Sequence, residues 1–309
     1  MRIVALPEIQ RALVYRETID VMREALLAYS RGECDTPMPM HLDIAAAHAE
    51  VHLKSSYRRG GKYFALKIAG TFPENQARGL PVGSGMMLLS SAETGEPVAF
   101  LADGGHLTDV RTAAVAAMVA RELGRNDRVL GILGTGIQAR LQARLHAEVL
   151  PLERTVLWGR TRERAELCRR ELEEMTPAID TVVVSSPAEV ARNARLIVTA
   201  TAARGPLLEA ADIAPGTHIS AVGADSPGKQ ELDPEILRKA ALVLVDSRRQ
   251  CEKLGELQHA ADVLSRAVEI GEFEFCTQAG HEDATTVCDI TGLGAEDLFI
   301  AEYCWEKTK

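Results

Sequence analysis

The chain has 309 residues, of which 46% are hydrophobic, enough to fill the cores of two ordinary domains. Its formal net charge of -9 at pH 7, with no Lys/Arg stripe to offset it, argues against a nucleic-acid partner. No apolar run is long enough to span a membrane, and the N-terminal segment becomes charged too soon for a signal peptide. We therefore expect a cytoplasmic protein.

The cysteines and histidines carry no recognisable site. The six cysteines show no CxxC spacing, and we interpret them as reduced thiols that are mostly buried. The eight histidines form no HExxH or similar pair of ligands. His41, His48 and His52 lie close together in the sequence, but such a group is more often found at the surface. The sequence thus predicts no metal site.

The first part of the chain predicts one helix followed by an antiparallel region. Residues 17–31 carry apolar side chains at helical spacing, and Gly32 ends the run. The period then changes to two in four strand-like runs that flank turns: 51–57, 62–70, 85–91 and 97–102. This pattern is typical of two hairpins.

Two cationic residues in this part are candidates for substrate binding. A helix begins near Thr108, with Arg111 in its first turn, where a cation opposes the helix dipole at a cost of roughly 0.3–1 kcal/mol. A bound anion, such as a substrate carboxylate, would reverse this cost. A salt bridge to Asp109 is the plainer alternative. Lys67 lies on the strand 62–70, where a single lysine is usually only solvated.

From about residue 128, apolar strands alternate with helical patterns. The six strands are 129–133, 155–158, 181–184, 196–201, 218–223 and 242–246. Apolar strands joined by crossovers predict a parallel sheet that is buried on both faces. The fold class is therefore α/β, with a Rossmann-type doubly wound sheet and an α+β domain that holds the antiparallel sheet. We place the first domain at 1–118, joined by a final strand and helix at 286–309, and the Rossmann domain at 119–285.

The stretch "RVLGILGTGIQARLQ" (128–142) predicts a dinucleotide-binding turn. Gly134-x-Gly136-x-x-Ala139 follows a strand and opens a helix, as the G-x-G-x-x-G/A fingerprint requires. Gly134 makes the tight turn, Gly136 admits the pyrophosphate, and Ala139 keeps the helix close to the sheet. The first helical amides then face the phosphates. A glycine-rich connecting loop without a ligand is the alternative.

The end of the second strand indicates which cofactor is bound. NAD sites usually carry Asp or Glu there, but this chain has Gly159-Arg160-Thr161. Arg160 and Thr161, assisted by Arg164, would bind a 2′-phosphate, so we predict NADP, with NAD still possible. Ordinary surface arginines are the alternative. The predicted cofactor-binding residues are Gly134, Thr135, Gly136, Ile137, Gln138, Ala139, Gly159, Arg160, Thr161, Arg164, Thr199, Ala200, Thr201, Val222 and Gly223.

Asp225 is the candidate acid/base residue. It lies in the loop that leaves the fifth strand of the nucleotide domain, and ligands bind at the carboxyl ends of such strands. A carboxylate beside the nicotinamide could exchange a proton with an amino or imino nitrogen. An Asx-type turn before Ser226-Pro227-Gly228 explains the same residue equally well.

Together, Lys67, "TDVRTAA", "GTGIQA" and "GADSPGKQELDPEIL" resemble the ornithine cyclodeaminase/mu-crystallin family, and "DITGLGAEDL" resembles its closing motif. The resemblance runs from about residue 35 to residue 300. It implies a homodimer whose first domain forms the subunit interface, with the terminal helix returning to that domain. It also implies NAD or NADP and a small amino- or imino-acid substrate, handled by cyclodeaminases, alanine-type dehydrogenases or ketimine reductases.

By the same resemblance, Lys67 and Arg111 would hold the substrate carboxylate or polarise its nitrogen, and Asp225 would be the acid/base residue. Asp225 counts against the mu-crystallin branch, which differs at this loop. An arginine common in the family is replaced here at Pro39. The group of cations that would hold the substrate carboxylate, which we call the clamp, therefore lacks one member unless Arg58 or Arg78 supplies it. The segment after Lys67 also departs from the family pattern.

The sequence leaves three functions open. An NADPH-dependent imino-acid reductase, or the reverse amino-acid dehydrogenase, is favoured because "WGRT" (158–161) suits NADPH. Cyclodeamination of ornithine or a related diamino acid with bound NAD is the alternative, supported by Asp225. A non-catalytic NADP-binding carrier is the third, although such a protein would not need Lys67, Arg111 and Asp225 together.

Overall fold

The computed structural model describes residues 1–275 and 284–309; Cys276 and His281 lie outside this part. The chain forms two compact units. Unit 1 comprises Met1–Arg111 and Leu293–Lys309, and unit 2 comprises Thr112–Gly292. Among the described residues, no helix is long and apolar enough to cross a membrane.

Unit 1 is built on a seven-stranded sheet with the order β1-β7-β6-β5-β4-β2, in which β3 pairs with β4. The strands are β1 (Arg2–Ala5), β2 (Cys34–Asp35), β3 (Met40–Ile44), β4 (Ala49–Arg58), β5 (Tyr63–Thr71), β6 (Gly83–Ser91) and β7 (Pro97–Ala102). All pairs are antiparallel except β1 with β7, which are parallel. The predicted antiparallel region is therefore present, with both hairpins.

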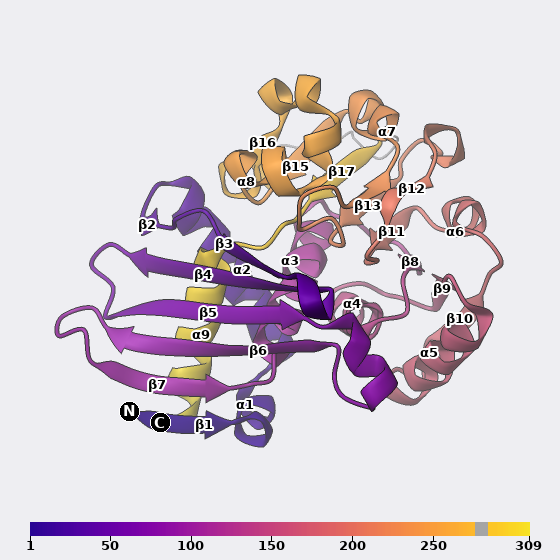
Figure 1. The fold of residues 1–309 in the computed structure, drawn as a ribbon. Helices are drawn as coiled ribbons and strands as arrows, with labels where there is room; N and C mark the ends of the chain where they lie inside the picture. Colours follow the sequence, from indigo (N-terminus) through magenta and orange to yellow (C-terminus); the bar gives the residue numbers. More distant parts are fainter. Residues whose placement is uncertain (276–283) are drawn as a thin grey trace. The chain divides into compact units, whose positions relative to one another are not determined.

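Helices cover one face of this sheet. They are α1 (Leu6–Ala12), α2 (Tyr15–Ser30) and α9 (Gly294–Thr308), with short 3-10 turns at η1 (Ala45–Ala47) and η2 (Pro73–Arg78). The C-terminal helix α9 packs against β4, β5 and β6 and against α1 and α2 (Figure 1). Its return to this unit brings Asp297, in its first turn, into contact with Lys67 on β5.

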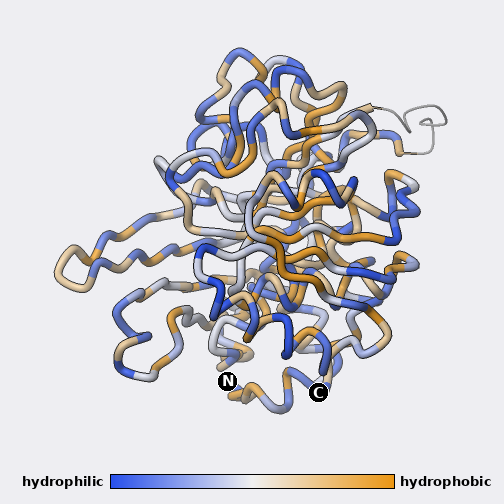
Figure 2. The backbone as a smooth tube through the Cα atoms, turned by 90° about the vertical axis from the view of Figure 1, so that its right-hand side faces the viewer, coloured by the Kyte–Doolittle hydropathy of each residue, from blue (hydrophilic) through white to orange (hydrophobic). Residues whose placement is uncertain are grey.

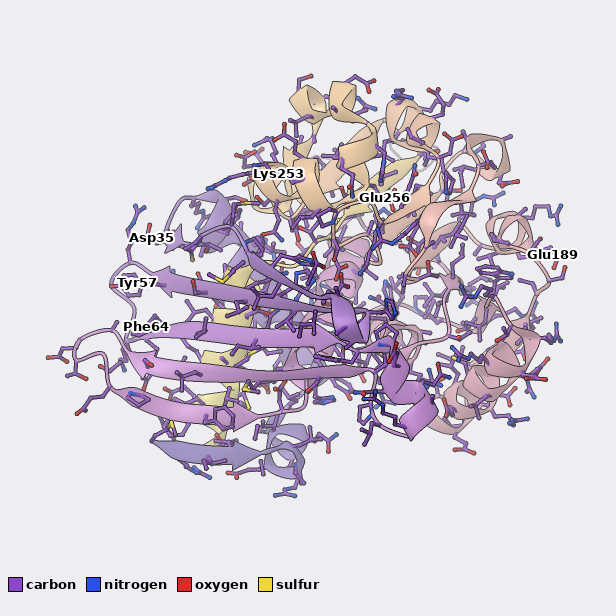
Figure 3. The ribbon with its side chains drawn as sticks, viewed as in Figure 1. Asp35, Tyr57, Phe64, Glu189, Lys253 and Glu256 are labelled. Atoms are coloured by element: carbon purple, nitrogen blue, oxygen red, sulfur yellow. The ribbon has the colours of Figure 1, made fainter. Side chains whose placement is uncertain are left out.

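The opposite face of the sheet is apolar and open. Side chains on a strand alternate between the two faces, so Leu66 and Phe64 point away from Lys67. Phe64 lies beside Tyr57, its partner on β4 (Figure 3). The large apolar side chains exposed on this face are Met40, Leu42, Ile44, Phe64 and Met86. We call these five residues the apolar face of unit 1.

Unit 2 contains an eight-stranded parallel sheet with the order β10-β9-β8-β11-β13-β17-β15-β16. The strands are β8 (Val129–Leu133), β9 (Arg154–Trp158), β10 (Asp180–Val183), β11 (Leu196–Thr199), β13 (His218–Ala221), β15 (Leu242–Val245), β16 (Val268–Glu269) and β17 (Thr286–Asp289). The order reverses between β8 and β11, as in a doubly wound sheet. This confirms the predicted fold class.

The connections of unit 2 are helical. They are α4 (Ile137–Ala147), α5 (Arg162–Met175), α6 (Pro187–Asn193), α7 (Pro234–Lys239) and α8 (Arg248–Leu254), with 3-10 turns η3 (Ala210–Asp212), η4 (Glu256–His259), η5 (Ala261–Arg266) and η6 (Ile270–Glu272). A small parallel ladder joins β12 (Arg204–Leu208) and β14 (Gln230–Leu232). Strands β8, β11 and β15 are mostly apolar, whereas helix α5 is rich in charged residues; Figure 2 shows the hydropathy along the chain.

The unit boundaries differ from those proposed from the sequence. Helix α3 (His106–Glu122) contributes its first residues to unit 1 and the rest to unit 2, so the division falls at Arg111 and not at 118. Strand β17 pairs with both β13 and β15 and therefore lies inside the parallel sheet. Only the chain from Leu293 onward returns to unit 1. The pairing partners of a strand lie far away in the sequence, so its pattern alone did not show which sheet it joins.

Candidate active site

The turn between β8 and α4 has the form expected of a dinucleotide-binding loop. Gly134 has φ +129°, and a Cβ there would lie 2.4 Å from the carbonyl oxygen of Ala200, so the fold itself requires glycine. A Cβ on Gly136 would meet nothing within 4 Å. The fold therefore leaves open space in front of the first turn of α4, where backbone N–H groups attract anions. Ala139 is fully buried against the sheet.

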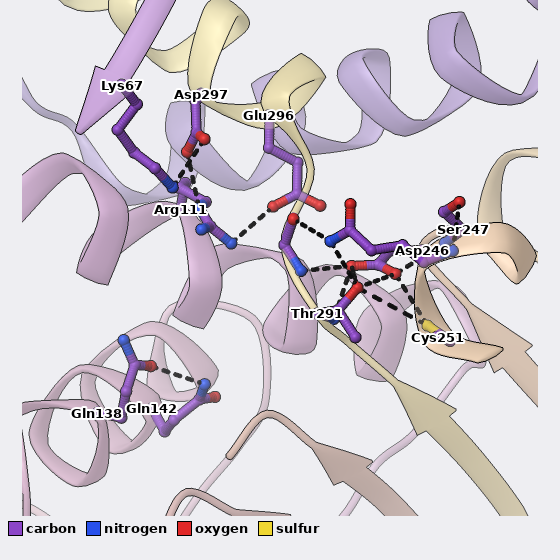
Figure 4. A network of polar contacts seen from close by, with 12 residues as sticks. Lys67, Arg111, Gln138, Gln142, Asp246, Ser247, Cys251, Thr291, Glu296 and Asp297 are labelled. Carbon is purple, nitrogen blue, oxygen red and sulfur yellow. Dashed lines mark hydrogen bonds and ion pairs between the residues drawn. The ribbon is translucent and has the colours of Figure 1, made fainter. Parts of the chain in front are cut away.

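The rest of the turn is held from within unit 2. Arg140 donates hydrogen bonds to the carbonyl oxygens of Thr135 and Gly136, at 2.9 and 2.8 Å. Gln142 donates to Gln138, one turn earlier on α4 (Figure 4). Ile137 is half exposed. These bonds fix the turn while its outer surface stays accessible.

The end of β9 carries no acidic residue. A Cβ on Gly159 would lie 2.3 Å from Cγ2 of Thr135, so a larger residue there would require the Thr135 side chain to move. Arg160, Thr161 and Arg164 are exposed, and within the described residues neither arginine has a polar partner. In contrast, Arg162 on the same helix is paired with Glu166. The Thr161 side chain makes no capping hydrogen bond to α5.

A buried glutamate that the sequence analysis missed organises the next part of the site. Glu231 accepts hydrogen bonds from the hydroxyls of Thr199 and Thr201, both at 2.7 Å, and from the backbone N–H of Gly223 at 3.0 Å. Burial raises its pKa to about 7, although these hydrogen bonds favour the carboxylate. Glu231 therefore ties together the carboxyl ends of β11 and β13.

The neighbouring residues complete this edge through their backbones. Ala200 donates from its N–H to Leu133, and Val222 donates to Thr199. These contacts bring the predicted cofactor residues of three strands, β8, β11 and β13, to one edge of the sheet. The signal for Glu231 was available in "GKQELD" (228–233), because this segment belongs to the same loop region as Asp225.

Asp225 lies in the loop after β13, as predicted, and is paired with a lysine. Lys229 Nζ lies 2.7 Å from Asp225 Oδ1, and Ser226 donates to the same oxygen at 3.2 Å. The Asp225 side chain is 44% exposed and the Lys229 side chain only 12%. Asp225 thus has a largely buried cationic partner in its own loop.

In unit 1, Lys67 and Arg111 meet at one buried carboxylate. Lys67 Nζ lies 2.8 Å from Asp297 Oδ2, and Arg111 Nε donates to Asp297 Oδ1 at 3.1 Å (Figure 4). Arg111 also donates to Glu296 at 3.0 Å. All four side chains are at most 4% exposed. The sequence analysis missed Glu296 and Asp297, although both stand in the closing motif "DITGLGAEDL".

The position of Arg111 corrects one expectation. Helix α3 begins at His106, so Arg111 lies beyond its first turn. Asp103 accepts a hydrogen bond from the N–H of Leu107 at 2.8 Å and so occupies the start of the helix. The favourable electrostatic interactions of Arg111 come from the acids of α9 and not from the N-terminus of α3.

A third cation joins this group. Lys54 on β4 is the cross-strand partner of Lys67 and is buried, with 8% exposure. Arg58 and Arg78, the two replacements considered from the sequence, are 45% and 64% exposed and paired with Glu33 and Glu74. The buried cation nearest to the clamp is therefore Lys54.

The electrostatics of this cluster favour an added negative charge. Burial lowers the pKa of Lys67 to about 7, and the charges of Arg111 and Lys54 act in the same direction against the attraction of Asp297. Burial opposes ionisation of Asp297, but the three cations outweigh it and hold its pKa below the ordinary value. Lys54, Lys67 and Arg111 thus gather around Asp297 in a buried setting, where a bound carboxylate could form further ion pairs with them.

Comparison with known proteins identifies the family of the chain. Residues 2–309 match the ornithine cyclodeaminase/mu-crystallin family. A relative named as an uncharacterized cyclodeaminase, y4tK of Sinorhizobium fredii, is 37% identical over 88% of this chain and 85% of its own.

Two solved structures share the fold over almost the whole chain. One is the Delta(1)-pyrroline-2-carboxylate reductase of Thermococcus litoralis in complex with NADH and L-proline, with TM-score 0.92 and 26% identity over 99% of this chain and 97% of that chain. The other is an archaeal alanine dehydrogenase dimer with bound NAD, with TM-score 0.89 and 29% identity over 99% and 95%. The resemblance found in the sequence is thereby confirmed, and the chain belongs to the ornithine cyclodeaminase/mu-crystallin family.

Proposed function

We propose that this protein is an NADPH-dependent reductase of a small imino acid, or the reverse amino-acid dehydrogenase. The observation that carries the proposal is the buried cluster of Lys54, Lys67 and Arg111 around Asp297. Buried cationic groups attract carboxylates, and a substrate carboxylate beside Lys67 and Arg111 would form further ion pairs with them. An α-imino acid offers that carboxylate next to the carbon that is reduced.

The residues of unit 2 fit a nicotinamide dinucleotide. The open space at Gly136 and the first turn of α4 would take the pyrophosphate, while Arg160, Thr161 and Arg164 would take a 2′-phosphate. The NADP preference rests on these three residues and on the missing acid after β9. When bound, the dinucleotide supplies a hydride for the imine carbon. Relatives crystallised with NADH and NAD make NAD the alternative cofactor.

The reaction also needs a proton at the imine nitrogen, and Lys67 is suited to provide it. Its pKa of about 7 lets it be protonated and still give up the proton near neutral pH. Asp225 is ion-paired with Lys229, and we assign to it the stabilisation of the positive charge of the protonated imine. This division assigns the proton to Lys67, whereas the sequence alone assigned it to Asp225.

Cyclodeamination of a diamino acid is the second candidate. It is supported by the relative y4tK, which is named as a cyclodeaminase, and by the presence of Asp225. In that reaction the Asp225 carboxylate would act on an amino nitrogen of the substrate. NAD would be regenerated in each turnover. Arg160 and Arg164 after β9 count against it, because a cyclodeaminase with permanently bound NAD has no 2′-phosphate for them to bind.

We further propose that the protein is a homodimer and cytoplasmic. The apolar face of unit 1 exposes Met40, Leu42, Ile44, Phe64 and Met86 on strands β3, β5 and β6, an arrangement typical of a protein interface. The related alanine dehydrogenase was solved as a dimer.

The decisive experiment compares cofactors and products. The purified protein is mixed with NADPH or NADH and a cyclic imino acid such as pyrroline-2-carboxylate, and loss of the reduced nicotinamide is followed by absorbance. We expect oxidation of NADPH to exceed that of NADH. Ammonia release from ornithine with catalytic NAD, and no imine reduction, would instead establish the cyclodeaminase.

An Asp225→Asn variant separates turnover from binding. Loss of the stabilising carboxylate should reduce kcat by roughly 10²-fold or more while NADPH affinity, measured by its fluorescence, is kept. Unchanged activity would exclude the role given to Asp225. A wild-type protein that binds NADPH but turns over no imino or diamino acid would point to the carrier.

A further inference from the structure

A second group of chemically active side chains lies on the β3–β4 hairpin of unit 1. His41, Glu50 and His52 each offer one ligand atom, and the three atoms all lie within 4.8 Å of one another. The two imidazole rings meet edge to face with centroids 4.7 Å apart. The sequence analysis expected these histidines at the surface, but the side chains of His52 and Glu50 are only 14% and 18% exposed.

The register of the hairpin explains why these residues meet. His41 is the cross-strand partner of His52, and Asp43 is the partner of Glu50. Directly paired residues, and residues two apart on one strand, share a face of the sheet. The four side chains therefore project from the same side of two rigid strands, so the group does not depend on a loop.

The hydrogen bonding of His41 prepares it as a metal ligand. His41 Nε2 lies 3.0 Å from Asp43 Oδ1, so this nitrogen carries the proton that the carboxylate accepts. The other ring nitrogen, Nδ1, is then left with its lone pair. This Nδ1 atom is buried and has no hydrogen-bond partner in the described structure. A carboxylate that orients a ligating histidine in this way is a regular feature of metal sites.

We propose that His41, Glu50 and His52 bind a divalent transition-metal ion of the Zn²⁺ class, with Asp43 as the positioning residue for His41. Ligand atoms of a tetrahedral zinc site lie about 2.0–2.2 Å from the metal and hence about 3.3 Å from one another. His52 Nε2 and Glu50 Oε2 are already 3.9 Å apart, so small side-chain rotations suffice. Three protein ligands leave the fourth position to water or another small ligand.

The ligand atoms of this group disfavour the binding of Mg²⁺ and Ca²⁺. Two imidazoles and one carboxylate suit Zn²⁺ or Co²⁺, whereas Mg²⁺ and Ca²⁺ require a set of oxygen ligands. The site is therefore expected to bind Zn²⁺ in the presence of excess Mg²⁺. It uses none of the residues assigned to the proposed reaction, so its test is independent of catalytic activity.

The test is metal binding by the full chain without a histidine tag. The protein is treated with a chelator, dialysed and titrated with Co²⁺, whose visible absorption reports four-coordinate geometry, and then with Zn²⁺ in competition. We expect one equivalent of Co²⁺ per chain, displaced by Zn²⁺ and not by Mg²⁺. Absence of the visible band, or weak binding of several equivalents, would overturn the proposal.

Variants identify the ligands. His52→Gln and Glu50→Gln should each weaken Zn²⁺ binding by about 10²-fold or more, and Asp43→Asn by about 10- to 100-fold, as removal of an orienting partner does. His48→Asn is the matched control, because His48 belongs to the same hairpin, is 79% exposed and lies outside the group. Asparagine also tolerates its left-handed backbone, φ +47°.

Circular dichroism of each variant shows whether the hairpin variants remain folded. Equal loss of Zn²⁺ binding in His48→Asn and His52→Gln would show an adventitious ion only. Full Zn²⁺ binding in both single variants, Glu50→Gln and His52→Gln, would show the same.

Discussion

Arg160 and Arg164 are exposed cations without a polar partner among the described residues, while Arg162 between them is ion-paired. If they bind the 2′-phosphate, Arg160→Ser removes a charged hydrogen bond worth about 1.5–3 kcal/mol. We expect the KM for NADPH to rise about 10- to 100-fold while the KM for NADH changes little. Steady-state kinetics with both cofactors measures this.

The matched control for Arg160 is Arg170→Ser, which removes an exposed arginine later on α5. It should leave both KM values unchanged. If Arg160→Ser affects NADPH and NADH equally, Arg160 contacts a part common to both dinucleotides and the NADP preference loses its basis.

At the scale of elements, the two glycines of the β8–α4 turn are expected to behave differently. Gly134→Ala forces a Cβ into the carbonyl group of Ala200 at a positive φ, so it should destabilise unit 2 by several kcal/mol. Gly136→Ala places its Cβ in open space at φ -82°, so thermal stability should stay within about 1 kcal/mol of wild type. Dinucleotide affinity should nevertheless fall in Gly136→Ala.

Thermal melts and NADPH titrations of both variants give the comparison. Normal dinucleotide affinity in Gly136→Ala would mean that the open space in front of α4 is not the pyrophosphate site.

The open sheet face of unit 1 predicts the oligomeric state. Met86 on β6 is 38% exposed beside other apolar side chains, and a charge there would be buried without a partner in a dimer. Met86→Glu should therefore convert the dimer to a monomer, as measured by light scattering after size exclusion. Met175→Glu on α5 is the control, because Met175 is equally exposed at 36% but belongs to unit 2. A monomeric wild type, or dissociation by both variants, would contradict the prediction.

Local patterns predicted most of the elements, because period and glycine placement are properties of short segments. The hairpin of β4 and β5 was predicted from its turn, and counting back from that turn pairs Lys54 with Lys67, so the third cation could have been found. The contact of Arg111 with Asp297 joins residues 186 positions apart, and no spacing rule gives it. The pairing of His41 with His52 likewise needs the register of β3, a strand that the periodicity did not reveal.

At the scale of the whole molecule, buried ionisable groups of unit 2 predict how stability depends on pH. Burial raises the pKa of Glu231 and of Asp289 to about 7 and that of Glu256 well above its ordinary value (Figure 3 shows Glu256). The folded state keeps these protons, while the unfolded chain releases them near pH 4–4.5. Each group therefore lowers the stability of the folded protein as pH rises toward the pKa that the group has in the folded state. Burial lowers the pKa of His146 to about 4 and of His218 to about 3, which costs stability as pH falls below about 6.5.

Between about pH 4.5 and 6.5, the three carboxyl groups of unit 2 therefore lower the free energy of unfolding as pH rises, whereas its two imidazoles raise it. Above about pH 6.5 only the effect of the three carboxyl groups remains in this unit. Lys67 makes the free energy of unfolding rise with pH, but only above about pH 7. We expect Tm to fall as pH is raised from 5.5 to 7. Glu256→Gln, which keeps an oxygen for the N–H groups of Glu231 and Leu232, should remove about 1.4 kcal/mol per pH unit from this slope. Glu252→Gln, at an exposed glutamate of α8, should leave the slope unchanged. A Tm that rises with pH over this range would mean that the three carboxyl groups are ionised in the folded protein.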